Sequence, residues 1–312
     1  MTSLLHRKLL VLTGKGGVGK TTVSAALGLL AADRGLHTIV VEMGQQRRLA
    51  ELFGVVTGNG AQDAGAETEL RPNLWSISID PDRALLEWLQ SLGGRVSGRV
   101  LASSGTFQYF AAAAPGAKEL ISMVKIWRLT EGRRAAHRRR GAYDLVILDA
   151  PATGHALGML HSPQTFGTIA RVGPIASQTK QVGELLSDPV RSAYLAVALP
   201  TEMAVTETLE LQDGLHRQID RSLDGVIVNG TLPRRFSAVE LTRIESLNAS
   251  DPATSSAALA ARAVHDRASF QHNQLARLRR RNFEVHPLPF LFVPELDLPA
   301  IERIAGHLSR WV

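Results

Sequence analysis

The sequence predicts an α/β fold built on a doubly wound, mostly parallel β-sheet with an inserted helical subdomain. Short apolar runs that suit buried strands alternate along the chain with longer stretches of helical periodicity. A glycine-rich segment also follows the first apolar run and precedes an amphipathic pattern, as a strand–loop–helix unit requires. These two observations favour one sheet with helices packed on both faces.

Strands are expected where short apolar runs stand between polar or turn-forming residues. Such runs lie at residues 9–12, 38–42, 74–79, 143–149, 193–199, 225–229 and 285–288. The run at 74–79 alternates apolar and polar residues, so we expect this strand to have two unlike faces. Residues 55–69 are rich in glycine and alanine and predict a loop with little capacity for packing.

Helices are expected where apolar residues recur three or four positions apart. Such stretches follow residue 20 and continue at 82–140, 164–188, 202–219, 254–282 and 297–311, with a break at Pro115–Gly116. The stretches 82–140 and 164–188 flank the strand at 143–149, and together they predict the inserted helical subdomain. A chain of this length suits a single domain spanning residues 1–312.

The segment Gly14–Thr22 fits the pattern G-x-x-x-x-G-K-[ST] of a phosphate-binding loop and predicts a P-loop NTPase. Glycines let backbone N–H groups turn inward around phosphate oxygens, and the next helix adds its N-terminal N–H groups. Lys20 is expected to reach the β- and γ-phosphates, and the Thr21 hydroxyl to bind Mg²⁺. The residues expected to hold the nucleotide are Gly14, Gly16, Gly17, Val18, Gly19, Lys20, Thr21 and Thr22.

A second anchor is Asp149, at the end of the apolar run Leu145–Leu148. Open α/β sheets bind ligands at the carboxyl ends of their strands, and an acid placed there can hold Mg²⁺ through water. An ordinary helix N-cap is the weaker alternative, because a phosphate loop lies upstream. We therefore expect Thr21 and Asp149 to form the metal site.

Two further features carry a resemblance to a known family. The run K-G-G-V-G-K-T-T has an additional lysine, Lys15, five residues before Lys20, and residues 150–155 read A-P-A-T-G-H. Both resemble the ArsA and guided-entry (tail-anchored protein targeting) family of deviant Walker A P-loop ATPases, most of all its single-loop actinobacterial members. The resemblance implies ATP hydrolysis by a dimer, in which Lys15 reaches the partner's nucleotide and residues 150–155 form switch II.

The resemblance extends towards the end of the chain. Glu207–Thr208 matches the family, and so does Val228–Asn229, which implies that Asn229 contacts adenine. Residues 287–295, with Pro289, resemble the loop on the adenine side. For Asn229, a turn residue before Gly230 is an equally weighted alternative. Capping or packing remains the alternative for the histidine of the T-G-H motif, to which no proton transfer is assigned.

The chain departs from the family pattern after its second strand. Family members have D-P-A-H there, with an aspartate that orients or deprotonates the attacking water, but aligning the tail Leu49–Gly54 places Gly44 at that position. Glu42 is the expected substitute, and Gln45 or Gln46 is the alternative. We therefore predict slow or partner-stimulated hydrolysis, with catalytic roles for Lys15, Lys20, Glu42 and Asp149.

Composition excludes several kinds of site. The chain has no cysteine, so it has no disulfide, thiolate zinc site, iron–sulfur cluster or arsenite site through cysteine. Met123 is the only methionine within 82–140, which does not favour a groove for transmembrane clients. A single phosphate loop disfavours the fused two-half arsenite-pump architecture. Neither a signal peptide nor an apolar stretch of ~20 residues is present, so a cytoplasmic location is expected.

Partners are the most open question. The expected partners are an identical or paralogous ATPase and an unknown protein client. The formal charge of +6 and the arginine-rich runs at 133–140 and 277–281 leave nucleic acid open, although solvated helix faces explain both runs. The closing helix at 297–311 suits packing on the sheet better than docking on a membrane. The alternative function is a nucleotide switch of the MinD/ParA type that binds a membrane surface or DNA.

Overall fold

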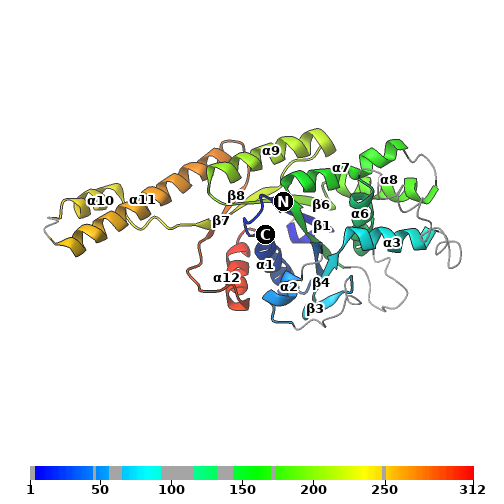
Figure 1. The fold of residues 1–312 in the computed structure, drawn as a ribbon, viewed down its shortest axis with the longest axis horizontal. Helices are drawn as coiled ribbons and strands as arrows, with labels where there is room; N and C mark the ends of the chain where they lie inside the picture. The colour runs from blue at the N-terminus through cyan, green and yellow to red at the C-terminus, as the bar shows by residue number, and fades with distance from the viewer. Residues whose placement is uncertain are drawn as a thin grey trace.

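The computed structural model describes residues 4–44, 47–55, 65–92, 116–131, 143–169, 173–247 and 251–312. In these residues, the strands form one sheet in the order β3-β4-β2-β5-β1-β6-β7-β8, parallel except for the antiparallel β3–β4 pair (Figure 1). The strands are β1 (Leu9–Gly14), β2 (Thr38–Met43), β3 (Thr68–Arg71), β4 (Leu74–Ile79), β5 (Leu145–Ala152), β6 (Ser192–Ala198), β7 (Gly225–Thr231) and β8 (Val285–Pro289). The predicted α/β class with a mostly parallel sheet is confirmed.

Helices cover both faces of the sheet, because the side chains of each central strand alternate between two buried layers. In β1, Leu9 and Val11 face one layer, while Leu10 and Leu12 face the other. Helices α1, α2 and α12 lie in the second layer. The helices are α1 (Lys20–Asp33), α2 (Arg48–Leu52), α3 (Pro81–Leu92), α6 (Ala117–Thr130), α7 (Thr153–Ile169), α8 (Gly173–Ser187), α9 (Glu202–Ile219), α10 (Ala238–Glu245), α11 (Pro252–Arg279) and α12 (Leu298–Leu308), with a short 3₁₀ helix at Leu4–His6.

Helices α3, α6, α7 and α8 pack against one another beside the sheet, where the sequence predicts a helical subdomain (Figure 1). The second helical stretch, expected from residue 164, begins earlier. Helix α7 starts at Thr153, directly after β5 ends at Ala152. Met123 is fully buried in this packing. Residues 93–115 and 132–142 of the predicted stretch, which include the arginines of the 133–140 run, lie outside the described residues.

One local expectation needs correction. The predicted loop at 55–69 ends in a strand, because β3 begins at Thr68 and pairs with β4. In β4, Trp75 and Ile77 face one layer and Leu74 faces the other together with Ser76, so its two faces differ in residue type. Both faces are buried, because β4 lies inside the sheet between β2 and β3 and α1 packs over the face that carries Leu74.

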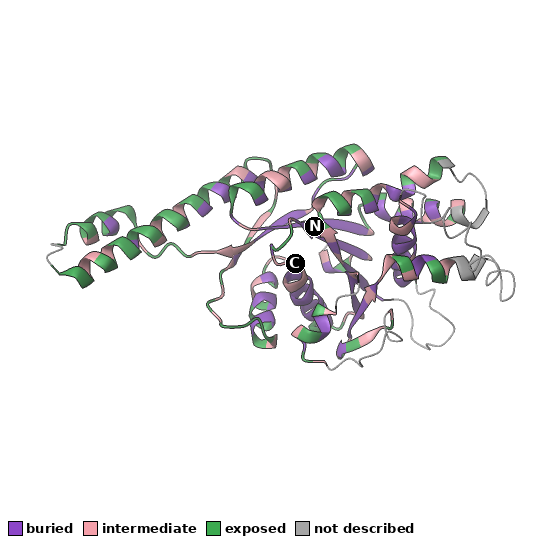
Figure 2. Cartoon of the chain, viewed as in Figure 1, coloured by how far each residue is buried: buried purple, intermediate pink, exposed green. Residues whose placement is uncertain are grey.

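Helices α10 and α11 form a pair that extends away from the sheet (Figure 1), and exposed residues dominate their outer part (Figure 2). A capping box between Ser237 and Glu240 starts α10, and the Asp251 carboxylate caps α11 just before Pro252. The sequence predicts α11 closely but gives no prediction for α10. The arginines that follow at 279–281 are exposed, as solvated residues at a helix end are expected to be.

Helix α12 packs against the rest of the fold, as the sequence favours, but mainly on α1 and less on the sheet, where it contacts β8. Its apolar stripe is buried against the second layer, including Ile301, Ile304 and Leu308. Because this stripe is already covered, α12 has no free apolar face with which to dock on a membrane. Within the described residues, no helix combines the length and apolar character needed to cross a membrane.

The packing of α12 predicts a large cost for shortening Ile301, which is 0% exposed. Ile301→Ala should lower the free energy of unfolding by about 3 kcal/mol, because it removes buried methyl groups and leaves a cavity. Urea denaturation measures this change. The matched control is Glu302→Ala, at the exposed neighbouring position, which should change stability by no more than about 0.5 kcal/mol. Equal effects of the two substitutions would contradict the packed position of α12.

Candidate active site

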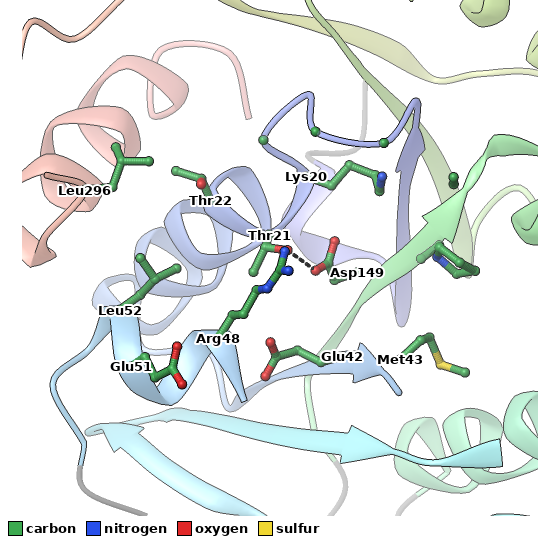
Figure 3. Close-up of a pocket in the computed structure, with 16 residues that line it drawn as sticks. Lys20, Thr21, Thr22, Glu42, Met43, Arg48, Glu51, Leu52, Asp149 and Leu296 are labelled. Atoms are coloured by element: carbon green, nitrogen blue, oxygen red, sulfur yellow. Dashed lines mark hydrogen bonds between the residues drawn. The ribbon is translucent and has the colours of Figure 1, made fainter. Parts of the chain in front are cut away.

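A cavity of about 710 Å³ opens at the carboxyl ends of β1, β2 and β5, between the glycine-rich loop and α2 (Figure 3). Open α/β sheets bind ligands at this edge. Six of the eight predicted loop residues and both predicted acids line the cavity, whereas Gly14 ends β1 and Val18 lines a neighbouring cavity. The cavity is lined by Gly16, Gly17, Gly19, Lys20, Thr21, Thr22, Glu42, Met43, Arg48, Glu51, Leu52, Asp149, Ala150, Pro151, Ala152 and Leu296.

Lys20 begins α1 and folds back over the loop that precedes it. Its Nζ donates hydrogen bonds to the carbonyl oxygens of Gly14 at 3.1 Å and Lys15 at 3.0 Å. Burial lowers the pKa of Lys20, and the charge of Asp149 opposes this shift. The ammonium group is thus held against the glycine-rich loop and lines the cavity, where it can meet an anion.

Thr21, in the first turn of α1, faces Asp149 on β5. Thr21 Oγ1 donates a hydrogen bond of 2.6 Å to Asp149 Oδ2. Burial raises the pKa of Asp149, while the bond from Thr21 lowers it. In the described part of the chain, the other carboxylate oxygen, Oδ1, is buried and accepts no hydrogen bond. A hydroxyl beside a carboxylate with an unused oxygen suits a hard cation such as hydrated Mg²⁺.

Glu42 ends β2 directly beside Asp149, its partner in the parallel β2–β5 register. Its side chain is buried, and its Oε1 accepts a hydrogen bond of 3.2 Å from the backbone N–H of Leu49 at the start of α2. Burial raises the pKa of Glu42 to about 7, with a further contribution from the charge of Asp149. A carboxyl group that titrates near neutrality can take a proton from water more readily than an ordinary carboxylate.

Lys15 does not point into this cavity. Its Nζ forms an ion pair with Glu207 Oε1 on α9, and both side chains are about one-third exposed. The structure therefore joins the additional lysine to the Glu207–Thr208 motif, which the sequence places in the same family pattern. Because the pair lies at the surface, solvent screening keeps it weak, and Lys15 can exchange partners.

A second cavity of about 350 Å³ adjoins the first, and Gly17, Gly19 and Thr22 line both. Asn229 and Pro289 lie in its wall, near the exposed Phe290 and Phe292 rings. Asn229 belongs to strand β7 and is not a turn residue.

The phosphate loop contacts Asn229 directly. Asn229 Nδ2 donates a hydrogen bond of 2.9 Å to the carbonyl of Val18. This amide lies so close to Gly19 that a Cβ there would collide with it, which explains the glycine at the N-cap of α1. The Asn229 side chain thus supports the loop, and its contact with adenine stays a prediction.

Gly44 has a positive φ of 100° just after β2. Its N–H bonds to Ile79 at 2.9 Å, and Ser78 donates a hydrogen bond to its carbonyl, so both of its polar backbone groups are tied to β4. A residue with a Cβ is strained in this conformation, which gives a physical reason for glycine where an aspartate was expected. The alternatives Gln45 and Gln46 lie outside the described residues.

Arg48 is the site residue that sequence reasoning missed. It starts α2 and directs its guanidinium group towards Thr21 and Asp149 (Figure 3). The signal available in the sequence was a cation in the segment that replaces D-P-A-H.

The T-G-H motif forms the first turn of α7. There, Thr153 Oγ1 is buried and has no partner among the described residues, whereas His155 is exposed.

Comparisons with known proteins agree with this geometry. A model of the anion-transporting ATPase family matches residues 7–173. The chain is 28% identical to ATPase BagA of Mycobacterium tuberculosis over 94% of this chain and 87% of that protein. It is 29% identical to a putative arsenical pump-driving ATPase of Prosthecochloris vibrioformis over 70% of this chain and 51% of that protein. It is 27% identical to ATPase GET3 of Kluyveromyces lactis, over 74% of each chain.

The positive φ of Gly44 predicts a stability cost for any side chain at this position. Gly44→Ala should lower the free energy of unfolding by about 1 kcal/mol, as measured by urea denaturation. Gly306→Ala is the matched control, because an added Cβ meets nothing within 4 Å at either position and Gly306 is helical. That control should stabilise the protein by about 0.5 kcal/mol. A stabilising effect of Gly44→Ala would contradict the observed backbone conformation.

Proposed function

Because the chain belongs to the anion-transporting ATPase family, whose model matches more than half of it, we propose that it is a Mg²⁺-dependent ATPase that works as a dimer. ATP would bind across the two adjoining cavities, with its phosphates at the glycine-rich loop and its base towards Asn229 and Pro289. Nucleotide state would then control the conformation of the helical subdomain, which would bind a protein client.

The observation that carries this proposal is the Thr21–Asp149 pair at the mouth of the phosphate loop. The unused Oδ1 of Asp149 and the Thr21 hydroxyl provide the oxygen donors that Mg²⁺ prefers. When bound, the ion would neutralise phosphate charge. Lys20 and the loop N–H groups would hold and orient the phosphates, which are the main contributions a protein makes to phosphoryl transfer.

Glu42 is the residue we assign to the attacking water. It lies beside Asp149 at the strand ends and has a pKa near that of a useful general base. Its carboxyl group would orient the water and accept its proton. Because Glu42 also accepts a bond from Leu49, it is anchored to α2 and is not free to follow the nucleotide. Slow hydrolysis, accelerated by a partner that moves α2, fits this arrangement.

Coupling to the helical subdomain would pass through switch II. β5 carries Asp149 and leads without a loop into α7, and α7 packs on both α6 and α8. A displacement of residues 150–155 on nucleotide binding would therefore move helices that hold the subdomain together. The second subunit, an identical chain or a paralogue, would receive Lys15 at its nucleotide.

The site assignment is tested by ATP binding and hydrolysis. The wild type should release phosphate from ATP only with Mg²⁺ present. Lys20→Ala should weaken ATP binding by about 100-fold in calorimetry, because charge-assisted hydrogen bonds to the phosphates are lost. Lys180→Ala, on the exposed face of α8, is the control and should bind like the wild type. Unchanged affinity of the Lys20 variant would refute the phosphate site.

Dimerisation is tested at Lys15. Lys15→Ala should bind ATP about as well as the wild type but fail to dimerise with ATP in light scattering, because the lysine pairs with Glu207 and does not line its own cavity. Lys8→Ala is the control, because it also removes one positive charge but lies just before β1. This variant should dimerise normally. A Lys15 variant that still forms the ATP-dependent dimer argues against the contact between subunits.

A further inference from the structure

Arg48 lines the nucleotide cavity, which is an unusual position for an arginine whose charge no described side chain pairs with. It is the first residue of α2, and among the described residues its guanidinium group forms no hydrogen bond or ion pair. Nevertheless, the side chain lines the cavity and points towards Thr21 and Asp149 (Figure 3). Its positive charge lies close enough to Glu42 and Asp149 to oppose the upward pKa shift of both carboxyl groups.

The charges around the cavity show why this arginine matters. The described side chains that line it include two cationic ones, Lys20 and Arg48, and three acidic ones, Glu42, Glu51 and Asp149. Lys15 is paired with Glu207 and does not contribute. The lining therefore carries at least as much acidic as basic charge, although its proposed ligand, ATP, is a polyanion. Without Arg48, Lys20 would be the only described cationic side chain facing the phosphates and the nearby acids.

Resting on the proposed function, we propose that Arg48 is a catalytic residue that donates hydrogen bonds to the γ-phosphate of ATP and stabilises it during transfer to water. In this step, the water oxygen bonds to the γ-phosphorus, and the bond from phosphorus to the bridging oxygen breaks. The electron pair of that bond stays on ADP, and the water proton passes to Glu42. The planar guanidinium suits the γ-phosphoryl oxygens, which share the charge of the transition state.

The direction of the Arg48 side chain is consistent with this role. The guanidinium group lies towards Thr21 and Asp149, the residues assigned to Mg²⁺ (Figure 3). Arg48 would leave them when the ion binds there, because like charges repel. The γ-phosphate is then the acceptor within the same cavity. Since Arg48 is exposed and packs into no core, this movement disrupts no buried contact.

The experiment compares Arg48→Ala and Arg48→Lys with Arg47→Ala. Arg47 precedes Arg48 in the same segment but does not line the nucleotide cavity, so its removal controls for the loss of one positive charge. Steady-state hydrolysis gives kcat and KM. Calorimetry gives the affinities for ADP and for a non-hydrolysable ATP analogue, which differ in the γ-phosphate. Thermal melting checks that each variant is folded.

Arg48→Ala should lower kcat by about 100-fold or more, since an arginine at the γ-phosphate contributes at least this much in other phosphoryl-transfer enzymes. It should also weaken binding of the analogue by about 10-fold while leaving ADP binding within about twofold. Arg48→Lys should retain part of the charge effect, with kcat lowered by about 10-fold, because lysine lacks the planar fork. Arg47→Ala should behave like the wild type in all three measurements.

Two results would overturn the proposal: equal effects of the Arg47 and Arg48 variants, or an equal loss of ADP and analogue affinity in Arg48→Ala. The second result would indicate a general role in shaping the cavity. A wild type that binds ATP without hydrolysing it would refute the proposed ATPase activity instead. In that case, the analogue-to-ADP ratio still decides whether Arg48 contacts the γ-phosphate.

Discussion

The parallel pairing of β1, β5 and β2 is the constraint on which the site depends. β5 lies between the other two strands, and its Asp149 stands level with Leu12 on one side and Glu42 on the other. This register brings the buried carboxyl group of Glu42 and the half-buried one of Asp149 to one edge of the sheet, directly beside the loop that leaves β1. Their mutual repulsion and burial are unfavourable, and the Thr21 hydroxyl, the Leu49 N–H and nearby cations offset part of that cost.

Much of this arrangement follows from local sequence patterns. The apolar runs predict the strands of the core, and the loop pattern with Asp149 at a strand end predicts which residues meet, because parallel strands share one carboxyl edge. Predictions of strands and of the loop succeed because a short segment carries both the pattern and the physical reason for it. The ion pair between Lys15 and Glu207 is different, because the sequence relates these residues only through the family resemblance.

Other features depend on packing that no short segment reveals. Helix α10 is short and mostly exposed, so its apolar pattern is weak. Its capping box and its contact with α11 stabilise it instead. The side-chain alternation in β4 predicts two unlike faces, but it does not reveal that α1 covers the face that carries the serines. For Arg48, the sequence shows only a positive charge in the segment after the second strand. The direction of its side chain depends on where α2 lies relative to β2 and β5, which is a property of the fold.

The turn at Gly44 explains why the chemistry of this segment differs from the family pattern. Its N–H and its carbonyl are both held to β4, and its φ is positive. An aspartate would be strained in that conformation. Glu42 reaches the cavity through its pairing with Asp149, and Arg48 reaches it from the start of α2. The proposed base, Glu42, lies near the end of β2, and Arg48 lies on a short helix, so a small movement of α2 can bring the two together around a phosphate. A partner that stabilises this movement would accelerate the proposed hydrolysis.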